Sequence, residues 1–124
     1  MDGKKRILLI DDDQAVIGYL AAKLSKYYEV ASTTDPRQAA RLARSELPDV
    51  ILCDIDMPRM SGGDVAALLE EDADTARIPF IYLTALVSPQ EAKELDGQVG
   101  GRPGVSKRAP LAELVEAIDR AVRG

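Results

Sequence analysis

The 124-residue sequence contains no histidine, no tryptophan and only one cysteine. The absence of histidine excludes Ser-His and Cys-His nucleophile pairs, an imidazole proton shuttle and a histidine-ligated zinc site. The single cysteine, Cys53, excludes an intramolecular disulfide and a CxxC site, and we interpret it as a small buried hydrophobe. The chemistry that remains belongs to carboxylates, lysine, hydroxyls and a hard metal ion.

Long apolar runs and basic charge are also scarce. The first apolar run, Ile7–Ile10, is too short for the core of a signal peptide or for a membrane span. We therefore expect a cytoplasmic protein with no membrane insertion. The formal net charge of -5 argues against a nucleic-acid partner, because phosphates require a basic face. The length suits one domain.

Three continuous apolar runs are each followed at once by a polar residue. They are Ile7–Ile10, Val50–Cys53 and Phe80–Leu83. Continuous apolarity predicts strands that are covered on both faces, as in a parallel sheet. Glu29–Ala31 and Pro103–Ser106 are weaker candidates for two further strands. We expect the glycine-rich residues 96–104 to form a mobile loop that shortens the start of the last strand.

Helical periodicity separates the apolar runs. Apolar side chains share one face in Ile17–Leu24 and in Leu111–Val122, and the core explains the latter stripe more simply than a weak homodimer. Helix starts are predicted at Asp35–Pro36, Ser61–Asp64 and Ser88–Pro89. Five β and five α units alternate in this reading, which predicts a doubly wound α/β domain with helices on both faces of the sheet.

Polar residues stand at the carboxyl ends of the predicted strands. Asp11, Asp12, Asp54 and Thr84 lie directly after or near strand ends, and Lys107 follows the last strand. In an open parallel sheet these positions meet at one edge, where ligands bind. Three neighbouring carboxylates repel one another unless a cation binds, and Mg²⁺ suits an all-oxygen site. The set fits phosphoryl transfer to an aspartate nucleophile.

With these residues in this order, the sequence resembles the receiver domain of two-component response regulators. The resemblance rests on Ile7–Asp13, Val50–Gly62, Thr84 with the alanine after it, and Lys107, in the family's order. It implies a flavodoxin-like parallel sheet of five strands in the order 2-1-3-4-5. It also implies that residues 4–123 form a single receiver (response regulatory) domain, with no effector domain present.

The resemblance further implies a phosphoacceptor and a metal site. Asp54 would carry the phosphoryl group as a 4-aspartylphosphate. Asp12, Asp54 and the backbone carbonyl of Asp56 would contact Mg²⁺ directly, and Asp11 would contribute through water. A phosphoprotein with a magnesium cofactor is therefore expected.

Two further residues have roles by the same resemblance. Lys107 would pair with the phosphoryl group or with the free carboxylate, and Thr84 would turn toward the phosphate. The phosphodonor would be a phosphohistidine on a sensor histidine kinase or a histidine phosphotransfer protein, and the small side chain of Ala85 would leave the site open to it. The protein would be a signalling domain that catalyses only its own phosphotransfer and autodephosphorylation.

The sequence departs from the family pattern at two positions. The family usually has proline directly after the lysine, but here Arg108 follows Lys107, which predicts a different loop path and leaves the reach of the lysine open. The family also tends to have an aromatic residue where this chain has Gly104. We therefore expect the phosphorylation chemistry to survive and the readout through the fourth helix and fifth strand to be altered or weak.

Two alternatives stay open from the sequence. A degenerate receiver would act as a phosphorylation-independent interaction module, which the departures at Gly104 and Arg108 favour. The Asp54-Ile55-Asp56 motif also matches the DxD core of phosphatases that use an aspartate nucleophile. That second family, however, opens its chain with the motif and generally needs more sequence for a substrate cap.

Overall fold

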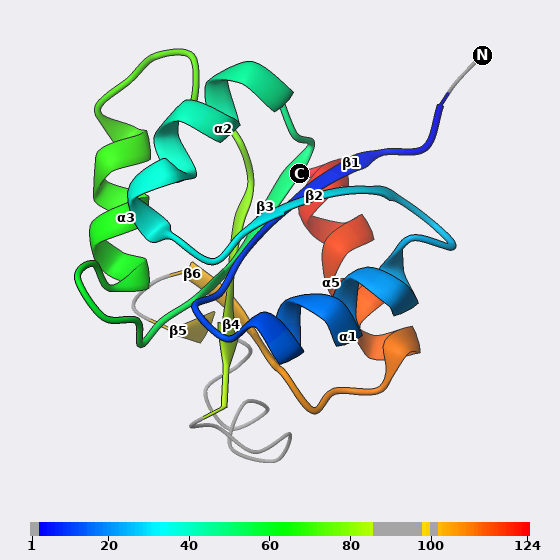
Figure 1. Cartoon of the computed structure of the whole chain (residues 1–124). Coiled ribbons are helices and arrows are strands. Elements are labelled where there is room, and N and C mark those ends of the chain that lie inside the picture. The colour runs from blue at the N-terminus through cyan, green and yellow to red at the C-terminus, as the bar shows by residue number, and fades with distance from the viewer. Residues whose placement is uncertain (1–2, 86–97, 100–101) are drawn as a thin grey trace.

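The computed structural model describes residues 3–85, 98–99 and 102–124, and its centre is a six-stranded sheet in the order β2-β1-β3-β4-β6-β5 (Figure 1). The strands are β1 (Arg6–Ile10), β2 (Glu29–Thr33), β3 (Val50–Asp54), β4 (Phe80–Thr84), β5 (Gln98–Val99) and β6 (Arg102–Ser106). All neighbours from β2 to β6 pair in parallel. The predicted parallel sheet of five strands in the order 2-1-3-4-5 is therefore confirmed.

The sixth strand is a feature that the sequence analysis missed. β5 pairs antiparallel with β6, with Val99 opposite Arg102 and Gln98 opposite Pro103. The expectation of a mobile loop over residues 96–104 was therefore wrong for the described part of that segment. The overlooked signal is the Gly-Gly pair between the two short strands, because two-residue loops of this composition favour β-hairpins.

Helices cover both faces of the sheet, as predicted. They are α1 (Gln14–Leu24), the 3₁₀ turn η1 (Pro36–Gln38), α2 (Ala39–Glu46), α3 (Gly62–Glu70) and α5 (Leu111–Arg123). Figure 1 shows α1 and α5 on one face and α2 and α3 on the other. The described residues thus contain four α-helices where five were expected, and the predicted start at Ser88–Pro89 lies outside the described residues. No helix in the described ranges is long and apolar enough to cross a bilayer.

Side chains of the central strands alternate between two cores. Ile7 and Leu9 point toward α1 and α5, whereas Leu8 and Ile10 point toward α2 and α3, because successive strand residues face opposite sides. All four are fully buried, which stabilises the fold by roughly 1.5–3 kcal/mol for each side chain. The apolar stripe of α5 lies in the first of these cores, as its interpretation as core predicts.

Capping side chains stand at the starts of the helical segments, and those of Asp35 and Ser61 were predicted. Asp13 caps α1 by accepting a hydrogen bond from the amide of Ala15 at 2.9 Å. Asp35 caps the segment that begins at Pro36, although this segment opens as a 3₁₀ turn before it continues into α2. Ser61 and the carboxylate of Asp64 form a reciprocal capping box at the start of α3. These caps fix the starts of α1 and α3, the helices that follow β1 and β3 along the chain.

Candidate functional site

Three carboxylates converge at the carboxyl edge of the sheet. β1 pairs in parallel with β3, so the chain leaves Ile10 and Cys53 side by side and places Asp11 and Asp54 next to each other. Oxygens from Asp11, Asp12 and Asp54 all lie within 4.8 Å of one another. Asp11 and Asp54 are buried and Asp12 is exposed. The predicted convergence of the three acids is therefore present in the structure.

Lys107 reaches the same point from the loop after β6. Its Nζ lies 2.8 Å from Oδ2 of Asp11 and 3.1 Å from Oδ1 of Asp54. The loop is held by two backbone amides, which donate from Lys107 to the carbonyl of Thr84 and from Arg108 to the hydroxyl of Ser106, both at 3.0 Å. The peptide bond before Arg108 is trans. Replacement of the usual proline therefore does not move the lysine away from the acids.

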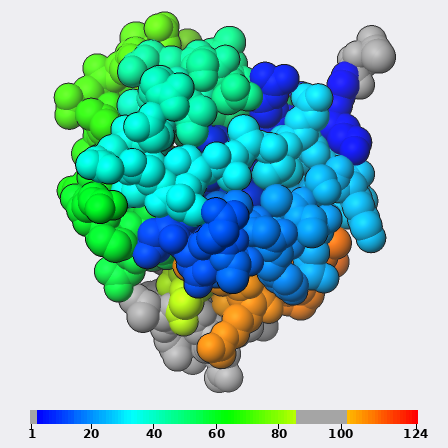
Figure 2. Space-filling view, in the orientation of Figure 1, coloured from blue at the N-terminus to red at the C-terminus, as the bar shows by residue number. Residues whose placement is uncertain are grey.

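A cavity of about 260 Å³ opens above these groups. Its lining residues are Asp11, Asp12, Asp13, Asp54, Ile55, Asp56, Thr84, Ala85 and Lys107. Thr84 ends β4 and is buried, whereas Ala85 and Asp56 are exposed. Figure 2 shows the edge where the blue start of α1, the yellow-green end of β4 and the orange segment after β6 meet. All predicted site residues therefore lie around one cavity.

Burial and charge perturb the titration of the site. Burial raises the pKa of Asp54 and the neighbouring Asp11 raises it further, while the hydrogen bond from Lys107 and the amide of Asp56 oppose that rise. Burial lowers the pKa of Lys107, but its contacts with Asp11 and Asp54 outweigh this and raise it overall. The ammonium therefore stays charged among three acids, and the site keeps an excess of negative charge.

The donor set fits a hard divalent cation. One buried oxygen, Oδ2 of Asp11, has no well-aligned hydrogen bond within the described ranges and lies 2.8 Å from the ammonium of Lys107. The ligands on offer are carboxylate oxygens from Asp11, Asp12 and Asp54, with no nitrogen or sulfur among them. Mg²⁺ prefers such oxygen ligands and keeps several waters, which an open cavity admits. The residues present therefore fit Mg²⁺.

The backbone beneath Asp54 depends on a glycine whose role the sequence analysis missed. The amide of Gly62 donates to the carbonyl of Ile55 at 2.7 Å. A Cβ on Gly62 would lie 2.4 Å from the carbonyl oxygen of Asp54, which is too close for any side chain. The available signal was the Ser61-Gly62 pair, because a glycine at a loop-to-helix entry often marks close backbone contact. Gly62 thus sets how closely α3 approaches the phosphoacceptor strand.

Cys53 behaves as predicted for a core residue. Its thiol is fully buried and donates to the backbone carbonyl of Asp54 at 3.3 Å. Burial raises the pKa of the thiol, and the nearby Asp54 carboxylate raises it further. A thiol that stays protonated is a poor nucleophile, so Cys53 supports the strand rather than the chemistry.

The fold and the site together define a doubly wound α/β protein with an acidic, lysine-paired cavity at the carboxyl edge of its sheet. The sequence matches the family model of the response regulator receiver domain over residues 7–119. This chain therefore belongs to the response regulator receiver domain family.

Curated relatives agree with this assignment. PilH of Pseudomonas aeruginosa is 33% identical over 121 residues, which cover 96% of this chain and 98% of PilH. The response regulator PleD of Caulobacter vibrioides is 44% identical over 82 residues, which cover 65% of this chain. The matched part spans only 18% of the length of PleD, so it corresponds to a small section of that protein.

Solved structures of receiver domains have the same fold. The receiver domain of the sensor histidine kinase PA1611 from Pseudomonas aeruginosa superposes with a TM-score of 0.81 at 26% identity, covering 98% of this chain and 100% of that domain. That structure has a magnesium ion coordinated in its active site cleft. The chemotaxis protein CheY4 of Vibrio cholerae superposes with a TM-score of 0.80 at 25% identity, covering 96% and 99% of the two chains.

Proposed function

We propose that this chain is the phosphoacceptor of a two-component or phosphorelay system and that Asp54 accepts the phosphoryl group. The observation that carries the proposal is the buried carboxylate of Asp54, held 3.1 Å from the ammonium of Lys107 beside Asp11 and Asp12. The donor would be a phosphohistidine on a sensor histidine kinase or a histidine phosphotransfer protein. Membership of the receiver family supports both assignments.

The transfer needs little beyond an ionised and well-placed carboxylate. An oxygen of Asp54 attacks phosphorus and forms a P–O bond, while the P–N bond to the donor imidazole breaks. The imidazole nitrogen keeps the electron pair and takes a proton from water. Lys107 lies where its ammonium can hold a phosphoryl oxygen, and Thr84 lines the same cavity with its hydroxyl. Because phosphoryl transfer depends mainly on position and charge, these groups suffice on the protein side.

Mg²⁺ is the cofactor that this site fits. Asp11, Asp12 and Asp54 would hold it, and Asp56 borders the cavity beside them. When bound, the ion neutralises charge on the phosphoryl oxygens as they approach the acids. Ala85 is small and exposed at the rim, so the cavity stays open to a donor. The chain's own acids thus create the need for a cation and also supply its ligands.

We further propose a signalling domain whose catalysis is limited to its own phosphorylation and dephosphorylation. The position of Lys107 favours this over the phosphorylation-independent module, because the lysine reaches the acids despite Arg108. Family membership favours it over the phosphatase suggested by the Asp54-Ile55-Asp56 motif. Conformation and partner binding would then follow the phosphorylation state.

One experiment tests the proposal. The protein is incubated with phosphoramidate and Mg²⁺ and its intact mass is measured, with EDTA in a parallel sample. We expect one phosphoryl adduct with Mg²⁺, none with EDTA and none in Asp54→Asn. Asp13→Asn is the matched control, because it removes an acid from the same run while asparagine still caps α1. This variant should take up the phosphoryl group as the unaltered protein does.

The other outcomes separate the alternatives. Repeated turnover of varied phosphomonoesters would support the phosphatase. Failure to form an adduct under any condition would overturn the proposal and support the phosphorylation-independent module. An adduct that persists in Asp54→Asn would place the phosphoacceptor elsewhere.

A further inference from the structure

Tyr82 occupies a central position between the site and the last parallel strand. It lies on β4 with Cys53 of β3 on one side in the register and Gly104 of β6 on the other. Gly104 has no side chain, so the β6 position beside the buried tyrosine adds no bulk. Tyr82 precedes Thr84 by two residues, and both side chains therefore leave the same face of the sheet. The ring thus lies next to Thr84 on this face of the sheet, on the side away from the end of β4.

The ring also contacts the start of α3. Cβ atoms built on Gly62 and Gly63 would lie 3.1 Å from Cε1 and 3.8 Å from the hydroxyl of Tyr82, respectively. The same Cβ on Gly62 would meet the carbonyl oxygen of Asp54 at 2.4 Å. The ring and the backbone carbonyl of Asp54 therefore both lie close to Gly62. A shift of that backbone cannot leave the ring's surroundings unchanged, because the interior is close-packed.

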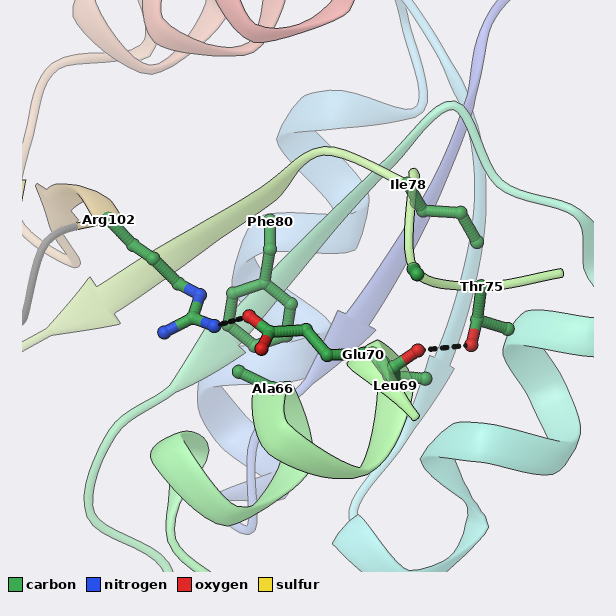
Figure 3. A pocket seen from close by; sticks show the side chains of 8 residues that line it. Ala66, Leu69, Glu70, Thr75, Ile78, Phe80 and Arg102 are labelled. Carbon is green, nitrogen blue, oxygen red and sulfur yellow. Dashed lines mark hydrogen bonds and ion pairs between the residues drawn. The ribbon is translucent and has the colours of Figure 1, made fainter. Parts of the chain in front are cut away.

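On its other side Tyr82 begins a line of contacts that reaches the far end of α3. Its ring packs edge to face against Phe80, with centroids 5.3 Å apart and planes at 80°. The guanidinium of Arg102 lies 6.0 Å from the Phe80 centroid and pairs with Glu70, the last residue of α3. Figure 3 shows Arg102, Phe80 and Glu70 together at the side of a cavity of about 180 Å³. The two rings therefore connect the first turn of α3 to its last residue.

We propose that Tyr82 transmits the phosphorylation state of Asp54 to the surface formed by Phe80, Arg102 and Glu70. This inference rests on the proposed phosphorylation of Asp54. Phosphorylation replaces the single negative charge of the Asp54 carboxylate with a phosphoryl group that carries about 1.5–2 negative charges and three acceptor oxygens, so the backbone at Asp54 and the hydroxyl of Thr84 must adjust to it. Tyr82 lies near the same glycine, Gly62, as the backbone carbonyl of Asp54, and it precedes Thr84 by two residues on the same face of the sheet. Its ring moves with them, and Phe80 carries the change to the ion pair.

The first test follows the ring itself. The chain has four tyrosines, so protein labelled with 3-fluorotyrosine gives four ¹⁹F signals, and Tyr82→Phe identifies the one from Tyr82. With Mg²⁺ and phosphoramidate we expect the Tyr82 signal to shift in step with the phosphoryl adduct seen by mass. The exposed rings of Tyr19 and Tyr27 should not shift. In Asp54→Asn the Tyr82 signal should stay in place.

The second test follows the far end of the contacts. The Nε–H signal of Arg102 should shift on phosphorylation of the unaltered protein and of Tyr19→Leu, but not of Tyr82→Leu, although all three take up the phosphoryl group. If Tyr82→Leu does not fold, Phe80→Leu interrupts the same contacts one ring further on and should give the same result.

Two results overturn the inference alone. One is an adduct on Asp54 with no shift of the Tyr82 signal, and the other is an Arg102 shift that persists in Tyr82→Leu. A protein that takes up no phosphoryl group overturns the proposed function, and the inference fails with it. The mass measurement therefore distinguishes the two failures.

Discussion

The two ends of the parallel sheet both carry charged residues, but they use them differently. At the amino end Arg6 donates its amide to Asp49 at 2.7 Å and its guanidinium to the carbonyl of Glu46 at 2.8 Å. The same guanidinium pairs with Glu29 at 3.3 Å, where both side chains are largely exposed. Asp49 and Glu29 thus each pair with Arg6, and Glu29 is exposed to solvent. Such groups complete the ends of strands at little electrostatic cost.

At the carboxyl end the charges are unbalanced, and two of the three acids are buried. Asp11 and Asp54 are buried with the exposed Asp12 beside them, and within the described part of the chain Lys107 supplies the one ammonium that pairs with Asp11 and Asp54. The raised pKa of Asp54, caused mainly by burial, shows that the fold opposes its ionised form. A buried charge that lowers the stability of the fold is typical of functional sites. The contrast between the two ends therefore supports the proposed site at the carboxyl end without reference to the family match.

The largest expected difference in unfolding free energy between the two ends comes from removing the cation at each of them. Lys107→Met leaves two buried carboxylates facing each other, and we expect a loss of about 2–4 kcal/mol in unfolding free energy. Arg6→Met removes a cation whose side chain is 43% exposed, and we expect a loss below about 1 kcal/mol. Urea denaturation at pH 7 in EDTA measures both. Equal losses would show that the two ends do not differ.

A smaller effect should distinguish two adjacent glycines at the carboxyl end. Gly62→Ala forces a Cβ against the carbonyl of Asp54, and we expect a loss of about 1–3 kcal/mol together with slower phosphoryl uptake. Gly63→Ala is the matched control, because its Cβ meets nothing closer than the Ser61 hydroxyl at 3.6 Å. Alanine is also the better helix former there, by about 0.5–1 kcal/mol. The two variants should therefore move the urea midpoint in opposite directions.

The fold was largely predictable because apolar runs and helix caps are local signals. Continuous apolar runs located β1, β3 and β4 to within one residue at each end. Asp35 and Ser61 cap helical segments as predicted. The strand order came from the family resemblance rather than from periodicity, which carries no information on which strands pair. β5 was missed because a two-residue strand is too short to show a period.

The sequence predicted which residues converge at the site. It did not predict the contacts that hold them in place. Asp11, Asp54 and Lys107 end up together because each follows a parallel strand. The path of the loop to Lys107 depends on the hydroxyl of Ser106, which no spacing rule identifies. The role of Gly62 depends on how closely its backbone approaches the carbonyl of Asp54, a distance between segments that are not adjacent in sequence. Distances between segments that are remote in sequence cannot be inferred from hydrophobic periodicity or motif spacing.

The smallest expected effect distinguishes the two ends most clearly. The same substitution, Asp to Asn, should raise the unfolding free energy at one end and lower it at the other. Ionised Asp54 is disfavoured by burial and by Asp11, so its folded pKa lies above the unfolded value and the charge destabilises the fold at pH 7. Asp54→Asn should therefore raise unfolding free energy in EDTA by about 1 kcal/mol. Asp49→Asn should lower it by about 0.5–1 kcal/mol, since the amide of Arg6 loses a charged acceptor.

Added Mg²⁺ provides the control for this pair. It should stabilise the unaltered protein and Asp49→Asn alike, because both keep the three acids at the carboxyl edge. It should stabilise Asp54→Asn less, since one ligand has lost its charge. If Asp54→Asn instead loses stability in EDTA, then Lys107 compensates the buried carboxylates fully. The carboxyl end would then be an ordinary ion-paired strand end, like the one around Arg6.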